Sequence, residues 1–193
     1  MTRPKEFNPD DVLEKAMHTF WHKGYEATSV EDLLTAMGIN RASFYDTFGS
    51  KRQLFLKALD RYCNGFICEK FSLLNQPGPA LPTLRRFVRV MLEGGLADPQ
   101  RRGCLIANTV MELAPHEKDI ARKACQGLDM GEDAFYKILA RAKMQGELSN
   151  DKDPRALARF LITMMQGTTV MIKAGMPADV VKPTADTALS VLD

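Results

Sequence analysis

Residues 37–51 read MGINRASFYDTFGSK and combine two glycines with three aromatic side chains. Gly38 is placed to end the preceding helix, because glycine readily adopts the left-handed backbone found there. A short helix is predicted over 40–47, and Ser50 is a suitable cap for the next one. At 100° per residue, Phe44 and Phe48 share one side of the short helix. The opposite side is small and polar, with Ala42, Ser43 and Asp46.

A second short helix precedes the turn at Gly38, and its apolar residues are Val30, Leu33, Leu34 and Met37. Two short helices joined by such a turn, with apolar residues on their facing sides, are typical of a helix-turn-helix. The second helix of that motif lies in the DNA major groove. A small, polar outer face lets its backbone approach the base edges, and Arg41 in the first turn can reach guanine or phosphate. This stretch therefore predicts a DNA-binding surface.

Helical patterns also fill the rest of the chain. Asn8-Pro9 begins a helix whose apolar stripe ends at Gly24, and a long fourth helix starts after Ser50. A turn-rich segment, 75–79, marks the domain boundary. Further helices are predicted over 82–97, 103–114, 117–146, 153–174 and 177–192. We therefore expect an all-α fold of about nine helices, with a helix-turn-helix domain over 1–50, a linking helix over 51–74 and a larger helical domain over 75–193.

Composition narrows the class of protein. The 193 residues are 45% hydrophobic and 26% charged, as in ordinary globular proteins. No apolar run is long enough to span a bilayer and the start lacks a signal-peptide core, so we expect a cytoplasmic chain with no membrane contact.

Residues 1–60 carry eight basic and nine acidic side chains. DNA binding would then depend on dimerisation and on a few local cations, namely Arg3, Lys5, Arg41, Lys51 and Arg52.

Three runs carry a family resemblance: GYEATSV from Gly24, LLTAMGI from Leu33, and FYDTFGSK from Phe44, which Leu54-Phe55 follows. Together they resemble the N-terminal domain of TetR-type transcriptional regulators over about residues 9–60. The remainder is similar to that family in being helical and of suitable length. The resemblance implies a DNA-binding domain joined to a helical domain for ligand binding and dimerisation.

The resemblance also implies roles for individual residues on the DNA side. Thr28 and Ser29, at the start of the second helix, would bind phosphate. Arg41, Ala42 and Ser43 would lie against the bases, and Tyr45, Thr47 and Lys51, the last near the start of the fourth helix, would contact the backbone. Asn40 is included in the DNA-binding set. The partner is therefore expected to be double-stranded DNA.

Asp46 departs from the bulky aromatic or imidazole residue common at its position in the family. A carboxylate facing DNA must either accept a hydrogen bond from a cytosine amino group or pair with a nearby cation. Arg41 and Arg52 are the available cations, and we favour such a pair. Asp46 is included among the DNA-facing residues.

The last two predicted helices have apolar faces wide enough to pack both inward and against a second copy of the chain. Such a homodimer would place two recognition helices roughly 34 Å apart, one turn of DNA. The alternative is a monomer that keeps these helices in its own core. Candidate interface residues are Phe160, Met164, Met171, Val181 and Leu189.

Residues 101–115, RRGCLIANTVMELAP, place Cys104 at the start of a predicted helix and beside two arginines. A helix N-terminus and nearby cations both stabilise a thiolate. The run also resembles TetR-type repressors that sense electrophiles or oxidants through a cysteine at this place. Asn108, Met111 and Glu112 follow on the same helix face and complete the candidate effector site. The alternative is that Cys104 is a small buried hydrophobe, the role expected for Cys63, Cys68 and Cys125.

No enzyme, cofactor or metal site is indicated. His18 and His22 are four residues apart, but the central Glu of a zinc-protease helix and a third ligand are missing. The sequence instead predicts a repressor that binds a palindromic operator as a dimer and is released by a small-molecule or thiol-reactive effector. The alternative is an architectural DNA-binding or partner-binding protein without a small-molecule switch.

Overall fold

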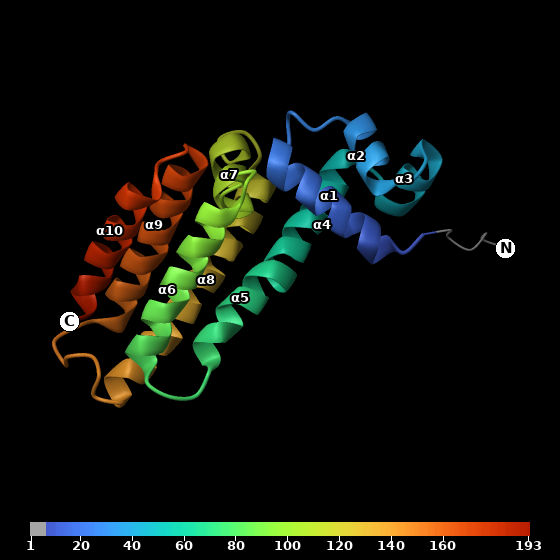
Figure 1. Cartoon of the computed structure of the whole chain (residues 1–193). Helices are drawn as coiled ribbons and strands as arrows, with labels where there is room; N and C mark the ends of the chain where they lie inside the picture. The colour runs from blue at the N-terminus through green and yellow to red at the C-terminus, as the bar shows by residue number, and fades with distance from the viewer. Residues whose placement is uncertain (1–6) are drawn as a thin grey trace.

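The computed structural model describes residues 7–193, and every regular element in that range is helical (Figure 1). This confirms the all-α prediction. The α-helices are α1 (Pro9–Lys23), α2 (Val30–Met37), α3 (Arg41–Phe48), α4 (Lys51–Arg61), α5 (Cys68–Ser72), α6 (Ala80–Ala97), α7 (Leu105–Leu113), α8 (Lys118–Met144), α9 (Pro154–Lys173) and α10 (Ala178–Leu189).

Local hydrogen bonds fix the starts of the first four helices. The side chains of Asn8, Ser29, Asn40 and Ser50 each accept a bond from a backbone N–H in the first turn of α1 to α4. Such caps satisfy donors that have no partner within the helix. Gly38 ends α2 with φ of 70°, in the left-handed region that favours glycine. The predicted turn before α3 is confirmed.

The long fourth helix is continuous but irregular. A π-helical segment, Tyr62–Ile67, joins α4 to α5, and a 3₁₀ turn, Leu73–Asn75, ends the run. Counted as one helix, this run brings the total for residues 7–193 to nine, the predicted number. A π segment inserts one extra residue and so rotates the side chains that follow it, a feature often found at functional sites.

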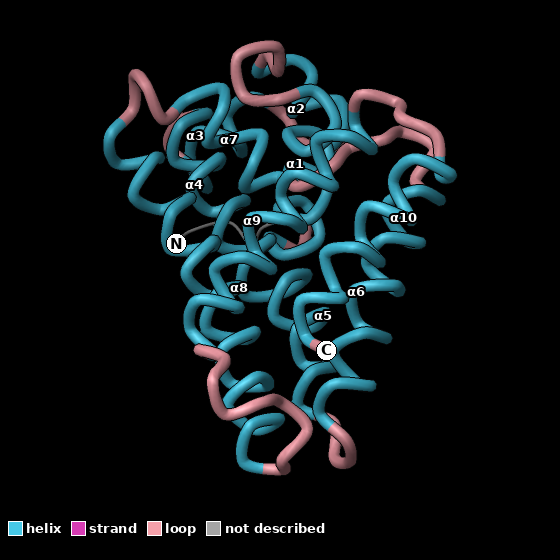
Figure 2. The backbone as a smooth tube through the Cα atoms, turned by 90° about the vertical axis from the view of Figure 1, so that its left-hand side faces the viewer, coloured by secondary structure: helices cyan, strands magenta, loops and turns pink. Residues whose placement is uncertain are grey.

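Helices α2 and α3 lie on the opposite side of the molecule from the C-terminal helices α9 and α10. Figure 1 shows α2 and α3 at one side, α9 and α10 at the other, and the α6–α8 bundle between them. Figure 2, turned by 90°, shows two loops at the far end of the bundle. There Glu147 accepts bonds from the backbone N–H groups of Ala80 and Leu81, at 2.9 and 2.7 Å, and so caps α6.

The apolar core has two parts that do not follow the predicted domain boundary. One part joins α1 to α4 with α7 and the start of α8, and it includes Cys104, Leu105 and Ile106. The other joins α6, most of α8, α9 and α10. The three-helix unit that carries α3 is therefore packed directly on α7. Among the described residues, no helix is both long enough and apolar enough to cross a bilayer.

Candidate DNA interface and effector cavity

Helix α3 has one buried side and one exposed side. Phe44 and Phe48 are 0% and 4% exposed and pack in the core. Tyr45 is 45% exposed. Ala42 and Asp46 are exposed, and Ser43 and Thr47 are half-buried. The two-sided helix expected from the periodicity is therefore present, with small and polar groups on its outer face.

The first turn of α3 combines a capped helix start with an accessible cation. The Asn40 side chain accepts a bond from the Ser43 N–H at 2.8 Å. The Arg41 guanidinium pairs with Glu31 of α2, and both side chains are more than half exposed. An exposed ion pair contributes at most about 1 kcal/mol, so phosphate or guanine can displace Glu31 from Arg41.

The start of α2 differs from the expected phosphate site. Thr28 is fully buried, and its hydroxyl donates to the Gly24 carbonyl at 2.5 Å. The prediction that the Thr28 side chain binds phosphate is therefore wrong, because its hydroxyl is used inside the fold. The Ser29 hydroxyl is exposed but donates to Asp32 at 2.8 Å. Hydrogen bonds from the Lys23 ammonium, and to a smaller extent from Ser29, hold the pKa of the Asp32 carboxyl far below its usual value.

The predicted pairing of Asp46 with a cation is also wrong. Arg41 is paired with Glu31, and Arg52 lies 3.5 Å from Glu117 and 3.4 Å from Asp119. Glu31 lies on α2, whereas Glu117 and Asp119 lie at the start of α8. Nothing in the sequence pattern predicts that the start of α8 lies near Arg52. Asp46 stays exposed on α3, without an ion pair among residues 7–193.

Lys51 begins α4 beside the recognition helix. Its ammonium lies 4.3 Å from the centroid of the Tyr25 ring, so the cation rests on an aromatic face. An ammonium in this position can reach a phosphate from the side of α3. The other two cations expected to act locally, Arg3 and Lys5, lie outside the described residues.

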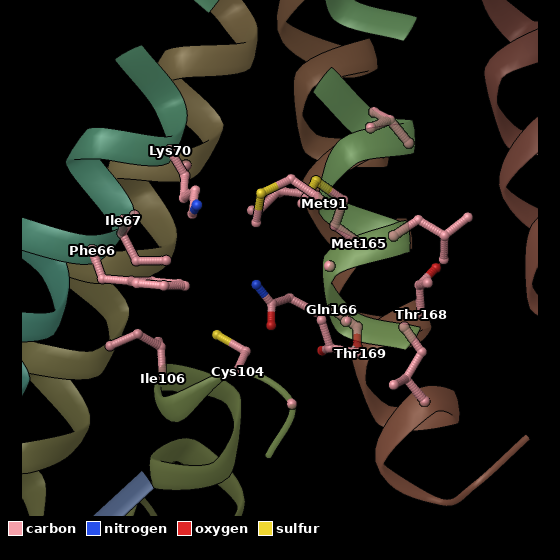
Figure 3. Close-up of a pocket in the computed structure, with 18 of the residues that line it drawn as sticks. Phe66, Ile67, Lys70, Met91, Cys104, Ile106, Met165, Gln166, Thr168 and Thr169 are labelled. Carbon is pink, nitrogen blue, oxygen red and sulfur yellow. The ribbon is translucent and has the colours of Figure 1, made fainter. Parts of the chain in front are cut away.

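A mainly apolar cavity of about 350 Å³ lies between α5, α6, α7, α8 and α9. Figure 3 shows side chains from α5, α6, α7 and α9 converging on it. Cavities of this size, with few polar groups, are typical small-molecule sites. Its lining includes Trp21, Tyr62, Phe66, Ile67, Lys70, Phe71, Met91, Asp98, Arg102, Gly103, Cys104, Ile106, Leu128, Ile162, Met165, Gln166, Thr168 and Thr169.

One wall of the cavity belongs to the DNA-binding unit. The indole N–H of Trp21, on α1, donates to the Gly103 carbonyl at 3.0 Å. The guanidinium of Arg102 lies 4.2 Å from the Trp21 ring and is held by Asp98 at 3.0 Å. All four residues line the cavity. A bound molecule would therefore touch α1 and the α6–α7 loop together.

Cys104 caps α7 and is 9% exposed, and its sulfur points into the cavity (Figure 3). The sequence predicted two arginines beside the Cys104 thiol, but the Arg102 guanidinium forms an ion pair with Asp98. Burial raises the pKa of the nearby Cys63 thiol to about 11. Cys68 and Cys125 are exposed, so the prediction that both are packing residues is wrong.

The other three candidate effector residues do not line this cavity. The Asn108 amide donates to the Arg102 carbonyl at 2.9 Å and so supports the loop before α7. Met111 is 62% exposed. Glu112 turns toward the α1–α2 loop. The helix-face argument placed these residues with Cys104, but the packing of α7 against α1 turns that face away from the cavity.

Glu112 forms a second connection between α7 and the DNA-binding unit. Its carboxylate accepts bonds from the backbone N–H groups of Tyr25 and Glu26, at 3.0 and 2.7 Å. An added Cβ on Gly24 would lie 3.0 Å from a Glu112 carboxylate oxygen, and Gly24 has φ of 86°. Glycine thus permits both the loop conformation and the close approach. The connection holds the segment that leads into α2.

The candidate dimer residues divide into three groups. Phe160 is 42% exposed on α9, whereas Val181 and Leu189 on α10 are at most 1% exposed. Met164 lines the cavity, and Met171 is half-buried. The prediction of an interface role for Val181 and Leu189 is wrong, because both side chains fill the chain's own core. The outer faces of α9 and α10 instead expose Phe160, Val170 and Val180, and Val191 is exposed in the 3₁₀ turn after α10.

Comparison with known proteins agrees with this architecture. Residues 12–58 match the family model "Bacterial regulatory proteins, tetR family", and residues 80–183 match "Tetracyclin repressor-like, C-terminal domain". The chain is 41% identical to the HTH-type transcriptional regulator YezE of Bacillus subtilis, with 100% of each chain covered. It is 30% identical to the HTH-type transcriptional repressor ComR of Escherichia coli, over 97% of this chain and 90% of that one.

Solved structures support the same assignment. A cysteine mutant of the TetR family regulator CifR, complexed with 26-bp operator DNA, superposes with a TM-score of 0.89 at 28% identity. The alignment covers 99% of this chain and 100% of that chain. A fold shared along the whole length, together with two family models and a close relative, is sufficient for the assignment. The chain belongs to the tetR family of bacterial regulatory proteins and is a DNA-binding transcriptional regulator.

Proposed function

We propose that this chain is a repressor that binds a palindromic operator as a homodimer and releases it when an effector occupies the cavity. The observation that carries the proposal is the shared wall: Trp21 belongs to α1 and also lines the cavity. The regulator acts in the cytoplasm, on double-stranded DNA, and needs no cofactor. Its relatives ComR and BdcR of Escherichia coli are named repressors.

The outer face of α3 reads the operator. Its small residues, Ala42 and Ser43, let the helix approach the floor of the major groove, and Arg41 reaches a base edge or a phosphate. Tyr45, Thr47 and Lys51 fix the register on the backbone. Asn40, Ser29 and Asp46 complete the DNA-facing set. With both candidate cations engaged elsewhere, Asp46 accepts a hydrogen bond from a cytosine amino group.

Release follows from contacts that α1 and α7 share. An effector that pushes on Trp21 or on the Arg102 guanidinium strains the bond from the Trp21 indole to Gly103. Since α7 also holds the α1–α2 loop through Glu112, any shift of α7 moves the segment before α2. The two recognition helices of a dimer then lose the spacing that fits one turn of DNA.

The free energy needed to shift the protein from its DNA-binding state to the released state is small. A ligand shifts an equilibrium only by its difference in affinity for the two states. A tenfold preference for the state that does not bind DNA corresponds to about 1.4 kcal/mol. One or two hydrogen bonds between the cavity and a ligand are sufficient for this difference.

The dimer uses the outer faces of α9 and α10. Phe160, Gly167 and Val170 lie seven and three residues apart on α9, and all three are exposed. Val180, Thr184 and Val191 form a matching exposed row on the C-terminal segment. Met171 borders the first row. Exposed apolar rows on neighbouring helices mark an interaction surface, and a two-fold copy would cover both with a four-helix bundle.

A second mode of release involves Cys104. The observation that favours it is the direction of the sulfur, which points into the cavity where a small electrophile would bind (Figure 3). Adduct formation there would place a new group against Trp21 and Ile106, as an effector does. The alternative, an architectural DNA-binding protein without a switch, leaves the cavity unexplained and predicts that no small molecule releases DNA.

Replacing Arg41 or Tyr45 with Ala should abolish operator binding while leaving the fold intact, because both side chains are exposed and the Tyr45 ring touches the core only through the edge of Phe44. The operator is first obtained by selecting bound sites from random DNA with the purified protein. The expected site is a palindrome with half-sites one helical turn apart. Binding is then measured by mobility shift, and folding by circular dichroism.

The matched control for this test is Lys137→Ala, which removes an exposed cation from α8. It should bind the selected operator like the wild type. Wild-type affinity in either the Arg41 or the Tyr45 variant, or selected sites without two-fold symmetry, would contradict the proposed mode of binding.

Glu112→Gln should loosen the connection between α7 and the α1–α2 loop. An amide offers one acceptor where the carboxylate offers two, and its NH₂ group faces a backbone donor. We expect a loss of about 1–2 kcal/mol in stability, a fall of several degrees in melting temperature, and weaker operator binding. Met111→Ala, at the exposed neighbouring position, is the control. Equal melting temperatures for the two variants would show that the Glu112 bonds contribute nothing.

Gly167→Arg should separate the dimer. An added Cβ at Gly167 meets no atom within 4 Å, so the monomer accommodates a side chain that a partner subunit would not. We expect a monomer by light scattering and a loss of operator affinity on the order of a hundredfold, because two half-sites no longer bind together. Gly65→Arg is the control, at a second helical glycine with open space. A dimeric Gly167 variant would place the interface elsewhere.

Cys104→Ser should abolish DNA release by a thiol-reactive quinone if Cys104 is the sensor. Because Cys68 and Cys125 are exposed, a quinone also modifies them, so the comparison needs a Cys68→Ser, Cys125→Ser background. Mass spectrometry locates the adduct, and fluorescence anisotropy with labelled operator reports release. Equal release from the background protein and from its Cys104→Ser derivative would eliminate the thiol mechanism and leave reversible effector binding.

A further inference from the structure

The charges around the cavity do not balance. Its lining contains three charged side chains, Lys70, Asp98 and Arg102. Asp98 and Arg102 neutralise each other through an ion pair of 3.0 Å. Lys70 has no carboxylate partner among residues 7–193. The walls of the cavity therefore carry one uncompensated positive charge.

Lys70 is directed inward. It extends from α5, and its ammonium points into the space between Phe66 and Met91 (Figure 3). The nearest compensating group is the Phe66 ring, whose centroid lies 5.4 Å from the ammonium. Lys70 is half-buried, and a cation–π contact of this length compensates only part of its charge. An anion placed beside Lys70 would offset much more.

Gln166 faces the same space from the opposite wall. Its amide extends from α9 toward the centre of the cavity, with the nitrogen on the side of Lys70 (Figure 3). The amide oxygen is buried and accepts no hydrogen bond from the described residues. Buried amides are normally satisfied, so this side chain is not explained by the needs of the fold. Its NH₂ group is placed to donate to the same anion as Lys70.

Most of the remaining lining is apolar and adaptable. Phe66, Ile106, Ile162 and two methionines, Met91 and Met165, surround the polar pair. Methionine adapts its shape to a bound molecule at little cost. An apolar cavity of 150 Å³ holds benzene, so about 350 Å³ suits an apolar body on the order of 10–15 non-hydrogen atoms.

We propose that the effector is an apolar monocarboxylic acid, bound as its anion, with the carboxylate between the Lys70 ammonium and the Gln166 amide. Its hydrocarbon part lies on Phe66, Met91 and Ile106 and reaches toward Trp21. This inference rests on the proposed function, since it names the class of molecule that releases DNA. A dicarboxylate is disfavoured because the cavity has one free cation among its described residues.

The test uses the single tryptophan of the chain. Trp21 lines the cavity, so its fluorescence reports occupancy without DNA. The probes are two matched pairs, 4-phenylbutyrate with 4-phenylbutyramide and decanoate with decanamide. Each pair has one shape and differs in charge. We expect at least one acid to bind at least about tenfold more tightly than its amide, the usual advantage of a charge-assisted hydrogen bond.

Lys70→Met keeps the length of the side chain and removes its charge. The preference for the acid should then fall to about twofold or less, while amide binding is kept or improved. Lys70→Gln repeats the measurement with a polar, uncharged side chain in case the methionine variant does not fold. Lys137→Met, on the exposed side of α8, should retain the wild-type preference.

Three results would overturn the inference: equal binding of acid and amide to the wild type, a preference that survives in both Lys70 variants, or no fluorescence response to either acid. Operator binding by the same preparations is measured separately. If the acids are not preferred over their amides but operator binding is intact, the monocarboxylate is rejected and the proposed function stands. Absence of operator binding rejects the proposed function, whatever the acids do. Acid binding without DNA release also overturns the inference, because the acid would then be a ligand of the cavity and not the effector.

Discussion

The contact between Trp21 and the loop before α7 is the constraint on which the arrangement of the molecule depends. The indole donates to Gly103, and the Arg102 guanidinium covers the ring while Asp98 holds it in place. One of the side chains that line the cavity is therefore also the one that attaches α1 to the loop before α7. An aromatic ring with one polar atom suits both tasks, because its face packs against a ligand and its N–H fixes its position.

The continuous core gives this contact its effect. Helices α1 to α4 share apolar packing with α7 and the start of α8, so α7 and the unit that carries α3 belong to one packed core. The π segment of the long helix is a second structural connection between the cavity and the DNA-binding unit. Tyr62, Phe66 and Ile67 line the cavity from that segment, and the same helix begins at Lys51 beside the recognition helix. Close-packed interiors transmit strain in this way because they cannot deform continuously.

The expectations that failed have both local and tertiary causes. Thr28 was assigned to phosphate from its place before α2, but its hydroxyl folds back on Gly24. Asp46 was paired with Arg41 or Arg52, yet each arginine is nearer to a carboxylate from another segment. Val181 and Leu189 were assigned to a dimer face because periodicity marks them as apolar, although it cannot show which apolar face a partner covers. The Thr28 bond is local, whereas the partner of Arg52 and the packing of α10 involve groups that are distant in sequence.

The helices, most of their caps, the turn at Gly38 and the two sides of α3 could be predicted from the sequence, because those features depend on bonds and periodicities within about four residues. Tertiary structure alone decided which side chains meet. The bond from Tyr25 to Glu112 spans 87 residues, and that from Trp21 to Gly103 spans 82. Lys70 and Gln166 face each other across one cavity from separate helices (Figure 3). Such pairs leave no local pattern, since their proximity depends on how whole helices pack.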